Sequence, residues 1–193
     1  MRRAEFWSAV ACVAIILLVG FTATAIMLMR LSAPHEVHDF RVSLVRLNSA
    51  IGQGLTNSKY SDLVLDARVN LELARPELTA SGKITACETA VVAAEQGAAV
   101  WQATLEKKLP ESAFEPMHAL GIIERDRFDA IVQSDSRVAD IPVTSPMWDS
   151  VQESRNELRR QIVSEMLTRV SFLIGESVGV INETAAKTGK PKH

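Results

Sequence analysis

The sequence predicts an all-α membrane protein, in which a single N-terminal transmembrane helix is followed by an up-down four-helix bundle with long first and fourth helices. Three observations support this prediction: an uncharged apolar run near the N-terminus, apolar residues at helical spacing along most of the remainder, and a scarcity of strand signals. The remainder is long enough for one domain with a core. We therefore divide the chain into a short cytoplasmic tail at 1–5, a transmembrane anchor at 6–31, a helical bundle domain at 34–187 and a flexible basic tail at 188–193.

The anchor rests on the stretch from Phe6 to Met29, which contains no charged residue. A helix rises about 1.5 Å per residue, so this stretch is long enough to cross a hydrocarbon core of about 30 Å. The alternative is a signal peptide, in which Arg2 and Arg3 form the basic region and cleavage follows the Ala23-Thr24-Ala25 segment. Apolar regions of signal peptides are only about 7–15 residues long, which favours an anchor held in the lipid bilayer.

The arginines on the two sides of the anchor do not decide its orientation, since they occur both before the span and after it. A short N-terminal tail with two arginines is difficult to translocate, whereas long C-terminal domains cross largely regardless of their charge. We expect a cytoplasmic N-terminus and an extracytoplasmic, periplasmic domain. The abundance of alanine, and of arginine over lysine, suggests the inner (cell) membrane of a bacterium.

The first helix of the domain is predicted to be long, ending at Pro76 and the segment Thr79–Gly82, where proline lacks an amide donor and glycine relaxes the backbone. The pattern weakens near Asn57, which leaves open whether the helix divides there. Apolar residues recur every three or four positions in two runs, the first at Val37, Phe40, Leu44, Leu47, Ile51 and Leu55 and the second at Tyr60, Val64, Ala67, Leu71, Ala74 and Leu78.

The second helix, from Ile84 to Leu105, has a face that is rich in small residues and would let a neighbouring helix approach closely. That neighbour is either another helix of the chain or a partner. On the last helix, two glycines at small-xxx-small spacing add to this set. The candidate partner-binding or helix-packing residues are Ala90, Ala94, Gly97, Ala98, Trp101, Gly175 and Gly179.

A third, less regular helix is predicted from a capping box at Ser112–Glu115 to about Ser134. Ser145-Pro146 then begins the long fourth helix, because serine caps free amides and proline at the first position has none to leave unsatisfied. Its apolar residues are Trp148, Val151, Leu158, Ile162, Met166, Val170, Leu173, Ile174, Val178 and Ile181.

This outline is similar, in architecture alone, to the extracytoplasmic sensor bundles of chemoreceptors and sensor kinases. Those receptors return through a second membrane helix to a cytoplasmic signalling module. Here Glu165, Arg169 and Glu176 interrupt the one candidate for a second span. Signalling of that kind would therefore require a separate membrane protein.

Three features of the sequence resemble catalytic or metal-binding sites, but the residues around them do not support those functions. The segment Gly175–Gly179 matches a Gly-x-Ser-x-Gly nucleophile elbow, but an esterase needs an acid and a histidine after the serine, and only a short polar tail follows. His35 and His38 have a spacing that could share a metal, yet a solvated first helical turn explains them better. Cys87 lies on an apolar stripe, as a buried thiol would. We predict no catalytic residue, no metal and no cofactor.

The formal net charge of −2 and the lack of a basic patch with interleaved aromatic residues exclude nucleic acid as an expected partner. We expect a non-enzymatic structural or accessory subunit that acts through helix-mediated contacts with a protein partner or with further copies of itself. The alternative is a ligand-sensing bundle that passes its state to a separate membrane signalling protein. Polar interior groups such as Arg68, Asn70 or Arg155 lining a pocket would favour the alternative.

Overall fold

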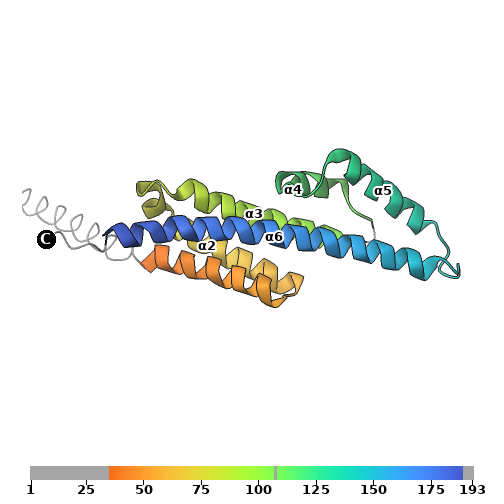
Figure 1. Cartoon of the computed structure of the whole chain (residues 1–193), viewed down its shortest axis with the longest axis horizontal. Helices are drawn as coiled ribbons and strands as arrows, with labels where there is room; N and C mark the ends of the chain where they lie inside the picture. The colour runs from red at the N-terminus through yellow and green to blue at the C-terminus, as the bar shows by residue number, and fades with distance from the viewer. Residues whose placement is uncertain (1–34, 107, 189–193) are drawn as a thin grey trace, which may run out of the picture.

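The structure is a computed structural model that describes residues 35–106 and 108–188, with side chains described as far as Glu183. Every regular element in these ranges is a helix, which confirms the all-α prediction. Figure 1 shows an elongated assembly in which one helix, α6 (Trp148–Thr188), runs along the full length of the others. The remaining helices pack on α6 in two groups, one towards each end.

The predicted long first helix is wrong, because the chain folds there into two antiparallel helices (Figure 1). Residues 35–53 form one helix and α2 (Asn57–Ala80) forms the next. Gly54 has a φ of +75°, a left-handed conformation that ends the first helix. The Thr56 side chain then accepts a hydrogen bond from the Lys59 amide at 3.4 Å and caps α2.

The apolar stripe predicted for α2 is buried in full, and α2 ends within one turn of the predicted stop, at Ala80. In the preceding helix, Phe40, Leu44 and Leu47 are completely buried. That helix is tied to α6 by polar contacts at two levels. Arg41 Nη1 donates to Asn182 Oδ1 at 2.7 Å, and Ser171 Oγ donates to Asn48 Oδ1 at 2.5 Å.

The helix α3 (Ile84–Thr104) lies between α2 and α6 and contacts both along its length. Its buried face consists mainly of alanine, glycine and valine, so the three helix backbones come close together. Charged pairs close the outer edge between α2 and α3. Arg75 pairs with Glu88, and Arg68 Nε lies 3.7 Å from a Glu95 carboxylate oxygen.

The predicted third helix is also wrong as a single element. The chain forms a 3₁₀ turn at Glu111–Ala113, then α4 (Phe114–Ala119) and, after a break, α5 (Arg125–Ala139). Gly121 at the break has a φ of +69°. Its amide donates to His118 O at 2.8 Å and the Ile122 amide donates to Met117 O at 3.0 Å, which is the Schellman pattern that ends helices at glycine. The residues proposed as a capping box form no side-chain cap.

The predicted anchor at 6–31, the tail at 1–5 and all but the first residue of the tail at 188–193 lie outside the described residues. Within the part of the chain that is described, no helix has both the length and the apolar character needed to cross a membrane.

Candidate functional site

The small-residue face of α3 points into the bundle. Ala90, Ala94 and Gly97 are buried, and Ala98 and Trp101 are half-buried against the core. The Tyr60 hydroxyl of α2 donates to Ala94 O at 3.1 Å, and the Tyr60 and Trp101 rings lie 5.6 Å apart. The structure therefore places these five predicted residues against other helices of the same chain.

The two glycines predicted on the last helix lie elsewhere. Gly175 and Gly179 are on the exposed face of α6, and a Cβ added at either position would meet no atom within 4 Å. Between them, Ser177 is fully buried and its hydroxyl donates to Cys87 Sγ at 3.5 Å. The apparent nucleophile elbow is thus one turn of a continuous helix. Burial raises the pKa of the Cys87 thiol, and the hydrogen bond from Ser177 lowers it in part.

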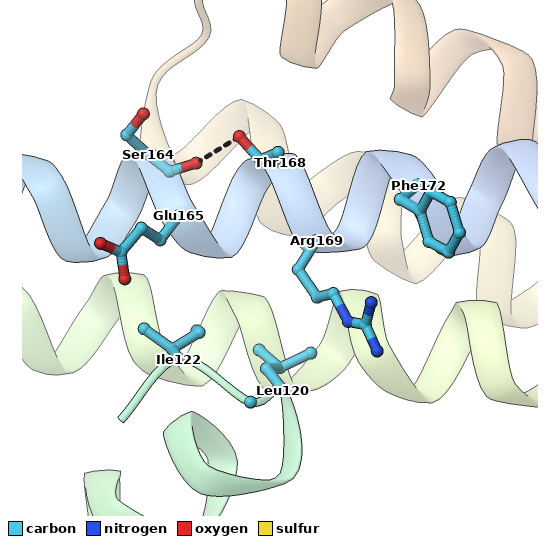
Figure 2. A pocket seen from close by; sticks show the side chains of 8 residues that line it. Leu120, Ile122, Ser164, Glu165, Thr168, Arg169 and Phe172 are labelled. Carbon is cyan, nitrogen blue, oxygen red and sulfur yellow. Dashed lines mark hydrogen bonds between the residues drawn. The ribbon is translucent and has the colours of Figure 1, made fainter. Parts of the chain in front are cut away.

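A cleft that sequence reasoning missed opens between the turn after α4 and the exposed face of α6 (Figure 2). Its volume is about 680 Å³. We call it the α6 cleft and define it by the residues that line it, which are Leu120, Gly121, Ile122, Ser164, Glu165, Thr168, Arg169 and Phe172. The buried side chains of Leu120 and Ile122 form its apolar side.

The α6 side of the cleft combines an exposed aromatic ring with charges. Phe172 is 54% exposed, although its neighbours on the predicted apolar stripe face the core. The Arg169 guanidinium carbon lies 5.7 Å from the centre of the Phe172 ring. Glu165 is one turn away, but Figure 2 shows its carboxylate pointing away from Arg169. No described residue forms an ion pair with either side chain. The cleft therefore offers an apolar surface, a cation and an anion.

A second polar site, for which Arg155 alone was named from the sequence, joins α5 to α6 near the other end of the molecule. Asp135 of α5 is only 4% exposed and accepts hydrogen bonds from two arginines of α6. Arg155 Nε lies 2.8 Å from its Oδ1, and Arg159 Nη2 lies 2.9 Å from its Oδ2. The Leu109 amide also donates to Oδ2 at 2.8 Å. One carboxylate thus connects α6, α5 and the segment that follows α3.

His35 and His38 are exposed in the first described turn. Among the residues that the structure describes, no three histidine, cysteine or acidic side chains converge in a way that could hold a metal ion.

Comparison with protein-family models, with curated proteins and with solved structures found no match for the chain. The geometry of its surfaces is therefore the basis for a functional argument.

Proposed function

We propose that this chain is a membrane-anchored, non-enzymatic accessory protein that binds a protein partner at the α6 cleft. The observation that carries the proposal is the exposed Phe172 ring beside an open apolar cleft. Aromatic residues and arginine are enriched at the centres of protein interfaces, where they supply much of the binding energy. Phe172 and Arg169 provide both types of side chain on one rigid helix.

The form of the cleft supports a protein partner. About half of Phe172 is exposed to water. Each Å² of this apolar surface that a partner covers contributes about 25 cal/mol to the free energy of binding. Arg169 and Glu165, which have no ion-pair partner among the described residues, would pair with complementary charges at the edge of the contact. We propose a partner helix or loop with an apolar side chain that enters between Phe172 and Ile122.

We propose the membrane arrangement that the sequence predicts. Residues 6–31 span the inner membrane of a bacterium, 1–5 stay in the cytoplasm, and the domain at 34–187 is extracytoplasmic. In this arrangement the start of the described domain and the end of α6 face the bilayer together, because Arg41 and Asn182 are in contact. The α6 cleft would then lie away from the membrane, accessible to another extracytoplasmic protein or domain.

The test is an affinity pull-down of the full chain from its native membrane in mild detergent, followed by crosslinking and mass spectrometry. We expect crosslinks from residues around Phe172 to one protein, and at least about a tenfold loss of its recovery for Phe172→Ala, as for an interface hot spot. Leu73→Ala is the matched control, since Leu73 is also 54% exposed but lies on α2.

Equal recovery from the wild type and Phe172→Ala would contradict the proposal, as would recovery of the chain without any crosslinked partner. Mixing isotope-labelled and unlabelled chains distinguishes a different protein from a second copy of this chain as the partner. Crosslinks between the two labels at the cleft would identify a second copy of this chain as the partner.

A ligand-sensing bundle that acts on a separate membrane signalling protein is the second candidate, and one observation favours it. Of the three polar residues named for it, Arg155 lines a cavity. Arg68 lies at the surface with Glu72 and Glu95, and Asn70 donates to Asp66. A sensing role would therefore depend on the Arg155 end of the molecule.

A further inference from the structure

A cavity of about 300 Å³ lies between α5 and the first turns of α6, at the opposite end from the start of the described chain. This volume is at the lower end of the range for small-molecule sites. We call it the α5–α6 cavity. It is lined by four aliphatic residues, three serines and one ion pair, namely Ile131, Val138, Val151, Leu158, Ser134, Ser150, Ser154, Asp135 and Arg155.

Arg155 has a hydrogen-bonding capacity that its surroundings do not use. Its Nε donates to Asp135 Oδ1, but its Nη2 is buried and has no acceptor in the described part of the chain. Asp135 is not free to supply one through Oδ2, because that oxygen already accepts from Arg159 Nη2 and the Leu109 amide. A buried donor without an acceptor destabilises the state that contains it.

The guanidinium of Arg155 also favours an anion as the ligand. Asp135, its partner carboxylate, is shared with Arg159, so this single negative charge is divided between two guanidinium groups. A guanidinium pairs best with planar, two-oxygen anions, because its donors match their geometry. None of the three serine hydroxyls accepts a hydrogen bond from Nη2. Ser150 and Ser154 lie at the exposed rim and donate to backbone carbonyls.

We propose that the α5–α6 cavity binds a small organic monocarboxylate with a compact apolar tail. The carboxylate accepts a hydrogen bond from Arg155 Nη2, and the tail packs against Ile131, Val138, Val151 and Leu158. The aliphatic lining disfavours inorganic phosphate, whose oxygens would lose water on that side without gaining hydrogen bonds. Because Nη2 is covered, binding requires a rotation of the Arg155 side chain, which is 15% exposed.

Ligand binding in the α5–α6 cavity does not depend on a protein partner at the α6 cleft. The two sites share no lining residue, and the experiments differ in their readout. Failure of one therefore leaves the other intact.

The test is calorimetric titration of the detergent-solubilised full chain with three probes: benzoate, its neutral analogue benzamide, and inorganic phosphate. We expect saturable binding of benzoate and affinity at least about tenfold weaker for benzamide, whose carbonyl acceptor carries no negative charge. Phosphate should not bind. Benzoate that fails to bind, or benzamide that binds equally well, would overturn the proposal. Phosphate that displaces benzoate would instead identify a site for simple anions, which also overturns it.

Two variants locate the site. Arg155→Met removes the donor, and Val151→Trp fills the cavity while all three side chains of the ion pair remain in the chain; each should abolish benzoate binding. Arg160→Met is the matched control, because Arg160 lies on the same helix but is exposed and forms an ion pair with Glu157 outside the cavity. If Arg155→Met does not fold, Val151→Trp decides the question. Benzoate binding that survives Val151→Trp would place the ligand elsewhere and refute the assignment.

Discussion

At the scale of single residues, Gly97 lies at a point where helices α2, α3 and α6 are in close contact. A Cβ at this position would lie 2.7 Å from the Tyr60 hydroxyl and 2.8 Å from Met166 Sδ. The methionine can move, but the tyrosine is held by its hydrogen bond to Ala94. We expect Gly97→Ala to lower the free energy of unfolding by about 1–3 kcal/mol, the usual cost of overpacking a core. Urea unfolding followed by circular dichroism measures it.

The control is Gly175→Ala, which also exchanges a glycine for alanine inside a helix. Gly175 is exposed and a Cβ there meets nothing within 4 Å, so only helix propensity changes. We expect a gain of about 0.5–1 kcal/mol. A loss of similar size in both variants would show that the interior contact at Gly97 is not the cause.

Tyr60 gives the bundle a sensitivity to alkaline pH. It is the only tyrosine of the chain, and burial raises its pKa well above the usual value of 10.0. The folded state therefore retains a proton that the unfolded state releases. Stability from this group is complete below about pH 10 and falls as the pH rises above that value. Absorbance at 295 nm should show no tyrosinate until the chain unfolds, and tyrosinate in a chain that retains its helical circular dichroism would contradict this.

At the scale of elements, the sequence predicted which side of a helix is buried more accurately than where the helix begins or ends. Every residue of the α2 stripe is buried as predicted, because heptad spacing reports which side of a helix meets the core. The spacing runs to Leu55 and resumes at Tyr60 after a weak spot, which does not show whether the chain turns there. Apolar residues on both sides of a tight hairpin face the same core, so periodicity alone does not separate one long helix from two. The residue in the sequence that favours a turn here is Gly54, which adopts the left-handed conformation.

Helix α5 shows a second limit of prediction from the sequence. Phe128, Ile131 and Val138 are its buried apolar residues, and Asp135 continues their spacing on the same buried face. A charged residue in an amphipathic helix normally marks the solvated side, so its burial was not predicted. Its partners Arg155 and Arg159 are distant in sequence, and only the fold brings the three together.

The contact of α5 with the rest of the molecule depends on that carboxylate. Asp135→Asn removes the charge that two arginines share, and breaking a buried ion pair costs about 3 kcal/mol or more. We expect faster amide hydrogen exchange throughout Arg125–Ala139, measured by mass spectrometry. Asp129→Asn on the same helix should cost less than about 1 kcal/mol, since its pair with Arg125 is exposed. Unchanged exchange in α5 after Asp135→Asn would show that apolar packing holds it instead.

For the whole molecule, burial is uneven along α6. From Ile162 onward a side chain is buried every three or four residues, whereas none of residues 148–161 is buried. Amides open more readily where fewer apolar contacts oppose opening. We expect hydrogen exchange in the full chain to be slower over 162–181 than over 148–158 by at least about tenfold. Uniform protection along the helix would mean that it opens as a single unit.

The surfaces proposed as sites were less predictable than the core. Arg155 was named from sequence as a polar residue that could line a pocket, and it does line one. Phe172 was missed because it lies next to the apolar stripe of α6 and not within it, and an off-stripe aromatic residue is the only signal that the sequence carries. The other side of the α6 cleft comes from the Gly121 turn, whose position depends on the break between α4 and α5.

The length of α6 also has a mechanical consequence. At about 1.5 Å per residue, Trp148 lies about 50 Å along the axis from Ile181. The buried half begins at Ile162, about 21 Å from Trp148, so a tilt of about ten degrees in the preceding segment displaces the Trp148 end by about 4 Å. A continuous helix would transmit a force applied at the α5 end to the packed half of α6, which contacts the first described helix.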